Sequence, residues 1–226
     1  REECRGVKAS LSKLPGGASG RVRLSDFHQE AVDGTLLFGE RTEFLAKLGA
    51  LDRSNSSDAY VLMPNYMISP SNCVGTTSFF DHCCPNECEG ILQDLEQALQ
   101  TPEASFAEIS GVLEAPQPVL AELEAAVRAG GGRIGLHGLP FAQWLHRAFP
   151  RDCPRPRPED FKRHAGREAE VPDAEAEFQA VAEVPMVASK AELLRELQQG
   201  NASAAAALPS LGAAPWAAGG GGGELE

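Results

Sequence analysis

The fold class is decided by the stretch CCPNECEGIL, residues 83–92. It places three cysteines at the start of a predicted helix, Asn86–Leu99, whose apolar residues recur at helical spacing. Pro85 suits the first turn of that helix, because the backbone N–H that proline lacks would be unpaired there. Cys84 and Cys88 are spaced i, i+4, so both lie near one face of the helix. We therefore predict a mainly α protein, a helical domain stapled by disulfides.

The chain has six cysteines, an even number that fits a disulfide framework. All of them are expected in disulfides: Cys4, Cys73, Cys83, Cys84, Cys88 and Cys153. Cys83 and Cys84 are not expected to pair with each other, because a bridge between neighbours strains the peptide that joins them. One of the two is predicted to form a disulfide with Cys73. Closing this loop would stabilise the folded protein by about 3 kcal/mol, because it restricts the unfolded chain. The other is predicted to reach Cys153.

The same cluster supports a second interpretation, a metal site. His82, Cys83, Cys84 and Cys88 offer nitrogen and sulfur ligands close together in sequence. Zinc sites favour paired Cys-x2-Cys motifs that lie well apart, and this chain has none. A catalytic thiol would need a free thiolate beside a base, which crowded cysteines disfavour. Disulfides are therefore the preferred interpretation, no cofactor is expected, and a Cys/His metal-binding or redox protein is the alternative.

Charge and composition narrow the functional class. The 226 residues carry 32 acidic and 20 basic side chains, a net charge of −12. Such a field repels a polyanion, so nucleic-acid binding is not expected. No run approaches the ~18 apolar residues that cross a membrane. The chain begins at Arg1 rather than Met, which is expected of a processed or excised piece. Two sequons, at Asn55 and Asn201, are candidate glycosylation sites; with the disulfides they favour the secretory pathway, the cell surface or an organelle lumen.

The chain divides into two regions of different composition. Residues 1–165 hold all six cysteines and are predicted to form the helical domain. Residues 166–226 are rich in Ala, Pro and Gly, as linkers are. One docking helix is predicted in this tail, near residues 189–199, because Ser189 and Glu192 form a capping box. That helix either packs back on the domain or binds a partner.

Helical spacing, capping boxes and terminal glycines predict further helices in the domain. They are Glu3–Leu14, Leu24–Val32, Thr42–Leu48, Phe106–Leu113, Val119–Arg128 and Phe141–Phe149. Tyr60–Met63 is short and apolar, as a strand would be, and Pro64–Thr77 is predicted to be a loop rich in turns.

Two segments resemble each other and the loop of an EF-hand. GRVRL starts at Gly20 and GRIGL at Gly132, and each lies between two predicted helices. With glycine at the sixth loop position, Val22 and Ile134 take the eighth. Eighth residues of paired loops meet in a minimal two-stranded bridge, so Val22 is predicted beside Ile134 in degenerate EF-hand-like helix–loop–helix units. The alternative is that the segment is only a recurrent turn-to-strand signal.

Calcium binding is disfavoured, because the ligand positions are mostly apolar or glycine. Calcium takes about 6–8 oxygen ligands, many of them carboxylate. The first, third and fifth positions of the two loops hold Pro15, Gly17, Ser19, Val127, Ala129 and Gly131. Asp26, at the twelfth position of the first loop, cannot supply the rest alone.

Segments spread over residues 20–154 are similar to a family of dinoflagellate-type algal proteins. They are GRVRLSDF, FLAKLGALD, PNYMISPSNC, CCPNECEGIL and GLHGLPFAQWLHRAFPRDCP, which occur in the same order in the family. The resemblance implies a secretory or membrane-tethered protein, and the family has no established activity. Its members often have His-Gly-Arg where this chain has His137-Gly138-Leu139, and the tail has no counterpart.

No catalytic residue is predicted. The sequence has no Walker loop, no G-x-S-x-G, no H-E-x-x-H and no dinucleotide fingerprint. His137 and His146 flank a predicted helix and could line a pocket with Trp144 and Arg147. Lone histidines at helix ends, however, are more often caps or surface groups.

These features favour a non-catalytic structural or protein-interaction module with protein partners. The second alternative, besides the metal or redox protein, is an accessory subunit of an algal photosynthetic or respiratory membrane complex, which would bring membrane association. A basic, proline-rich stretch is either a solvated exit from the domain or a docking site for an acidic partner or lipid headgroups. Its cations are Arg147, Arg151, Arg155, Arg157, Lys162, Arg163 and Arg167.

Overall fold

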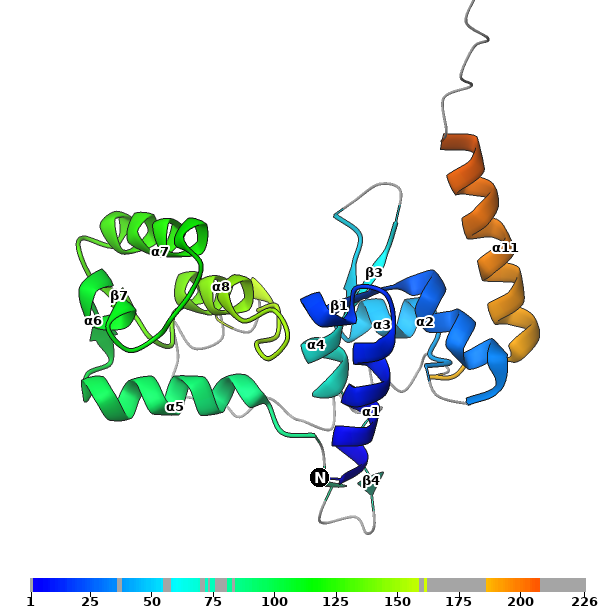
Figure 1. Cartoon of the computed structure of the whole chain (residues 1–226), viewed down its shortest axis with the longest axis horizontal. Helices are drawn as coiled ribbons and strands as arrows, with labels where there is room; N and C mark the ends of the chain where they lie inside the picture. Colours follow the sequence, from blue (N-terminus) through cyan, green and yellow to red (C-terminus); the bar gives the residue numbers. More distant parts are fainter. Residues whose placement is uncertain are drawn as a thin grey trace, which may run out of the picture.

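The structure, a computed structural model, describes residues 2–35, 38–54, 58–69, 72, 74–75, 81–82, 84–158, 161 and 186–207. The protein is mainly helical, as predicted, and its described elements gather in two lobes that meet at one junction (Figure 1). We call residues 2–67 the N-terminal lobe and residues 87–148 the C-terminal lobe. A tail helix, α11, lies against the outer side of the N-terminal lobe.

The N-terminal lobe is built from short helices around a three-stranded antiparallel sheet. Its elements are α1 (Glu2–Lys13), η1 (Gly17–Ser19), β1 (Arg21–Arg23), α2 (Leu24–Glu30), η2 (Ala31–Thr35), α3 (Thr42–Lys47), β2 (Leu51–Asp52), β3 (Tyr60–Leu62) and α4 (Met63–Met67). β3 is the central strand and pairs with both β1 and β2. Val22 lies opposite Val61 in the β1–β3 pair, and both side chains are fully buried, which suits β-branched residues on the core face of a sheet.

The C-terminal lobe packs helices around a two-stranded antiparallel pair. Its elements are α5 (Glu87–Leu99), β6 (Glu103–Ala104), α6 (Phe106–Ser110), α7 (Gln117–Ala129), β7 (Ile134–Gly135) and α8 (Leu139–Ala148). Ala104 lies opposite Ile134. The core of this lobe centres on the fully buried Trp144, whose ring stacks on Phe141 and whose indole N–H donates to the Val119 carbonyl at 2.8 Å. A separate pair, β4 (Val74–Gly75) and β5 (Asp81–His82), precedes α5.

Both lobes contain two helix–strand–helix units in succession, and the N-terminal lobe has one further strand, β2, before β3. In each lobe the strands of the two units, β1 with β3 and β6 with β7, pair antiparallel, which is the layout expected of two paired EF-hands. The prediction that Val22 lies beside Ile134 is wrong, because these residues belong to different lobes with separate cores. Their partners are Val61 and Ala104, so each lobe holds a complete helix–loop–helix pair.

Local sequence explains where several elements begin. Asn86 caps α5 by accepting from the Cys88 amide at 3.2 Å. Ser105 and Glu108 form the predicted capping box of α6. The predicted loop Pro64–Thr77 is wrong over residues 64–67, because Met63–Met67 form α4, with proline in its first turn, where its missing N–H costs nothing.

Gly20 sits where the two lobes approach each other. Its φ is 80°, in the left-handed region that glycine adopts without strain. A Cβ at this position would clash with the backbone carbonyl of Pro150, which follows the C-terminal lobe. Glycine is therefore required here both by the turn and by the contact between lobes.

The tail helix α11 (Lys190–Ala207) begins at the predicted capping box of Ser189 and Glu192. It extends beyond the predicted end at residue 199, and it packs back on the domain against α2 (Figure 1). Leu193 is 2% exposed and forms a small core with Val32 and Ala188. Among the described residues, no helix is both long enough and apolar enough to cross a membrane.

Candidate functional site: the junction between the lobes

Two disulfides lie at the junction, Cys4–Cys84 and Cys88–Cys153. The first ties α1 to the segment that leads into α5. The second ties α5 to the segment after α8, so the prediction that Cys153 binds Cys83 or Cys84 is wrong. Cys73 and Cys83 lie outside the described residues. The disulfides confirm a stapled helical fold, and they are compatible with an oxidising compartment.

The alternative metal site is not assembled. Cys84 and Cys88 are each bonded to another cysteine, so neither offers a thiolate ligand while oxidised. His82 lies in β5, and Cys83 is outside the described residues. Within the described part of the chain, no group of three or more His, Cys, Asp or Glu side chains is placed to hold a metal ion.

The segment after α8, residues 149–158, crosses from the C-terminal to the N-terminal lobe, and we call it the strap. The side chain of Asn65, in α4, pairs with the backbone of Arg155 in the strap. It donates to the Arg155 carbonyl at 3.0 Å and accepts from the Arg155 amide at 2.8 Å. The Arg155 guanidinium donates to the Asp52 carboxylate at 3.0 Å. Burial opposes the charge of Asp52, but hydrogen bonds from Ser54 and Arg155 outweigh it and lower the pKa of this carboxyl.

Lys8 links α1 to both α5 and the strap. Its ammonium group contacts Glu87 at the start of α5, and it lies 2.9 Å from Asp152 of the strap. Burial alone would lower the pKa of Lys8. The hydrogen bonds and negative charges of Glu87 and Asp152 have the larger combined effect and raise it. Sequence reasoning missed Lys8, Asn65 and Asp52, because their partners are distant in the chain and leave no local pattern.

A cleft of about 380 Å³ opens beside this network, between the lobes. We call it the interlobe cleft. Its walls come from α1, α4, the start of α5 and the strap. The lining residues are Cys4, Arg5, Lys8, Pro64, Met67, Ile68, Cys84, Pro85, Glu87, Arg151 and Asp152.

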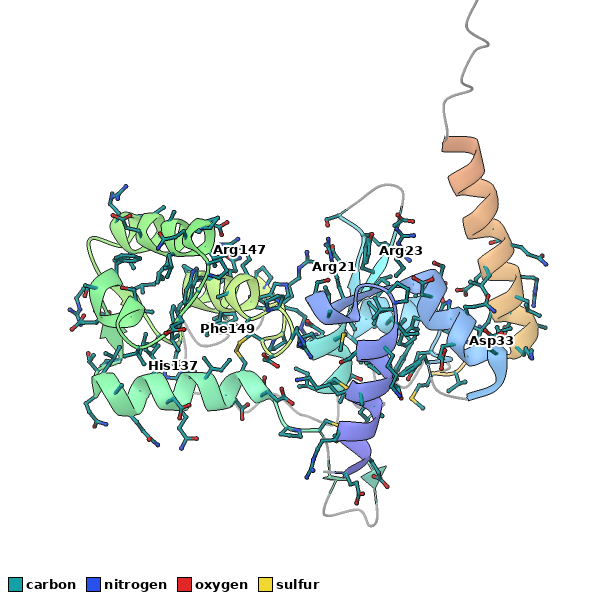
Figure 2. The ribbon with its side chains drawn as sticks, in the orientation of Figure 1. Arg21, Arg23, Asp33, His137, Arg147 and Phe149 are labelled. Atoms are coloured by element: carbon teal, nitrogen blue, oxygen red, sulfur yellow. A yellow bond between two sulfur atoms is a disulfide. The ribbon has the colours of Figure 1, made fainter. Side chains whose placement is uncertain are left out.

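The residues predicted to line a pocket in the C-terminal lobe do not converge. His137 lies toward α5 and contacts Glu96 at 2.6 Å, whereas Arg147 pairs with Glu122 of α7 (Figure 2). His146 binds the Cys153 carbonyl through Nδ1, and burial lowers its pKa. The Trp144 ring is fully buried in the core. These side chains hold the lobe together and form no shared site.

The structure adds two further loops, whose twelfth positions are occupied by residues with other partners. Counted forward from Val61 and Ala104 at the eighth positions, the twelfth positions hold Asn65 and Glu108. Asn65 is committed to the strap, and Glu108 accepts from the Ser105 amide and hydroxyl. The two residues at the twelfth positions therefore already have structural partners.

The contact between α11 and the N-terminal lobe combines a β-bridge with polar pairs. Glu40 bridges Val187, and the side chains of Arg41 and Thr42 bind Glu192 and Glu196 at 2.8 and 2.7 Å. Beneath them, the buried His28 ring binds the Glu40 carbonyl at 2.9 Å, and burial lowers the pKa of His28.

The remaining predicted site residues lie away from the junction or outside the described residues, except for Arg151 and Arg155. Asn201 lies in α11, which is helical rather than the surface loop in which sequons usually lie. Asn55 is outside the described residues. Of the basic stretch, Arg147 and Arg155 are in ion pairs and Arg151 lines the interlobe cleft. Lys162, Arg163 and Arg167 are also outside the described residues.

No protein-family model, curated protein or solved structure matches this chain. The resemblance to the algal family therefore stays a prediction.

Proposed function

We propose that this chain is a non-catalytic protein-interaction module that binds a partner helix without calcium. Its setting would be the secretory pathway, the cell surface or an organelle lumen, where disulfides persist. The observation that carries the proposal is the docked α11: the EF-hand-like N-terminal lobe already holds a helix on its surface.

The contact has the chemistry of helix recognition. One leucine, Leu193, anchors α11 against Val32, and Glu192 and Glu196 add polar pairs on either side of it. An amphipathic helix that lays its apolar residues against an apolar surface is a common mode of helix recognition. A partner helix with the same pattern could take the place of α11.

Calcium-dependent EF-hand proteins expose their binding surface when the ion reorganises the helices. Here the first loop of the N-terminal lobe has Pro15, Gly17 and Ser19 at its first, third and fifth positions, which do not supply a calcium site. The two disulfides also hold α1 and α5 in place. The lobe is therefore expected to bind helices constitutively.

The test uses the full oxidised chain, its Leu193→Glu variant and the matched Leu194→Glu variant. Leu193 is 2% exposed and Leu194 is 41% exposed, so only the first substitution should release α11. A fluorescent peptide of residues 186–207 is titrated and its anisotropy recorded, with calcium and with a chelator. We expect binding to Leu193→Glu alone, with the same affinity in both buffers.

Two results would contradict the proposal. If Leu193→Glu releases α11, as seen by hydrogen exchange, but does not bind the peptide, the lobe is no helix receptor. If binding requires calcium, the constitutive mechanism is wrong.

A further inference from the structure

The interlobe cleft is lined by more cations than carboxylates: Arg5, Lys8 and Arg151 against Glu87 and Asp152. Lys8 is matched by Glu87 and Asp152. Arg5 and Arg151 are exposed at the cleft, and their side chains form no ion pair or hydrogen bond with the described residues. Arg151 nevertheless lies close enough to Asp152 for its charge to lower the pKa of that carboxyl. In a chain with a net charge of −12, the excess of one cation still makes the cleft locally positive.

The interior of the same cleft is apolar. Met67 is 8% exposed and lines it together with Pro64 and the Cys4–Cys84 disulfide. Ile68, which is 37% exposed, adds apolar surface at its edge. Thioether and disulfide sulfurs are polarisable and adapt to apolar groups of varied shape.

We propose that the interlobe cleft binds a small organic anion, a carboxylate carried on an apolar chain or ring. The guanidinium groups of Arg5 and Arg151 bind the carboxylate through charge-assisted hydrogen bonds, and Met67 and Pro64 contact the apolar part. The volume of about 380 Å³ falls in the usual range of small-molecule sites. This site is separate from the surface that binds α11.

The walls of the cleft are fixed before any ligand binds. The Cys4–Cys84 disulfide joins α1 to the segment before α5, and Lys8 links α1 to Glu87 and Asp152. Binding therefore needs little reorganisation, which favours even a small ligand.

Methionine methyl groups report directly on this site. The chain has three methionines: Met63, which is fully buried, Met67, which lines the cleft, and Met186, which is exposed outside it. The full oxidised chain, labelled with ¹³C at the methionine methyl groups, is titrated with octanoate and, separately, with octanol. We expect octanoate to shift the Met67 resonance to saturation while Met63 and Met186 stay in place, and octanol to bind much more weakly.

Charge variants separate binding in the cleft from general amphiphile binding. Arg5→Gln and Arg151→Gln should each weaken octanoate binding about fivefold. Lys13→Gln, on the same helix as Arg5 but outside the cleft, should leave it unchanged. An unmoved Met63 resonance shows that each variant is folded.

The proposal is overturned if octanoate leaves Met67 unchanged or shifts Met186 in step with it. It is also overturned if octanol binds as well as octanoate, or if both arginine variants bind like the original chain.

Discussion

Val22 lies directly opposite Val61 in the β1–β3 pair, and both side chains are fully buried. In the C-terminal lobe, Ala104 and Ile134 hold the same relationship. Each pair joins two helix–strand–helix units that are far apart in sequence. The paired strands are therefore what makes each lobe one packing unit, with its own apolar core.

Truncating one member of the first pair should destabilise the N-terminal lobe. Val61→Ala removes two methyl groups from a site with no solvent exposure, and we expect a loss of about 2 kcal/mol. Urea unfolding followed by circular dichroism measures it. The matched control is Val112→Ala, because Val112 is 38% exposed and should change stability by less than about 0.5 kcal/mol. Equal effects of the two substitutions would argue against a buried Val22–Val61 pair.

The Cys88–Cys153 disulfide spans 65 residues of sequence. Removing it with Cys88→Ala and Cys153→Ala together should cost about 4 kcal/mol, because the unfolded chain regains the freedom of a long loop. Urea unfolding followed by the fluorescence of the buried Trp144 measures the loss. Peptide mapping under non-reducing conditions should recover Cys4 linked to Cys84 and Cys88 linked to Cys153. A peptide that links Cys153 to Cys83 would contradict the structure.

Acid should loosen α11. Hydrogen bonds from Ser189, and then from Arg41, lower the pKa of Glu192 from 4.5 to about 2. The Ser189 bonds belong to the capping box of α11 itself, whereas the Arg41 bond joins α11 to the N-terminal lobe. Because the pKa is lowered in the folded, docked state, the ionised carboxylate stabilises both the start of α11 and its docking above pH 4.5, and this contribution is lost as the pH falls from 4.5 toward 2. Hydrogen exchange of the α11 amides should accelerate across this window.

The Glu192→Gln variant is the control for this pH dependence. It keeps the size of the side chain but cannot ionise, so its α11 should lack the part of the acid response that Glu192 supplies. Identical pH profiles for the variant and the original chain would show that Glu192 does not couple docking to pH.

The sequence predicted the local signals well and the distant partners poorly. The glycine turns before Val22 and Ile134 are local patterns, and both do lead into short strands. Their partners could not be found the same way. The loop before Ala104 has Pro102 where glycine was sought, and the loop before Val61 also contains β2. The sequence pattern therefore predicts that the strands of Val22 and Ile134 pair with each other, whereas in the structure each pairs within its own lobe.

The junction was predictable only in part. The convergence of cysteines at the start of α5 holds for Cys84 and Cys88, because Cys88 lies in the first turn of α5 and Cys84 in the segment just before it. The choice of Cys4 and Cys153 as partners depends on how α1 and the strap cross that helix. Lys8 and Asn65 depend on the same crossing, so no window of sequence contains both ends of their contacts.

Asn65 is the residue that attaches the strap to the N-terminal lobe. Its side chain is 6% exposed, and its amide pairs with both the carbonyl and the N–H of Arg155. Asn65→Ala leaves two backbone groups without these partners and should cost about 2 kcal/mol. Both disulfides remain, so the sensitive readout is local: hydrogen exchange of the Arg155 amide should rise about tenfold or more.

Asn86→Ala, which removes only the cap of α5, should cost about 1 kcal/mol and leave that amide protected. If the Arg155 amide exchanges at the same rate in Asn65→Ala as in the original chain, the strap is held by its other contacts, the Asp52 ion pair and the Cys88–Cys153 disulfide.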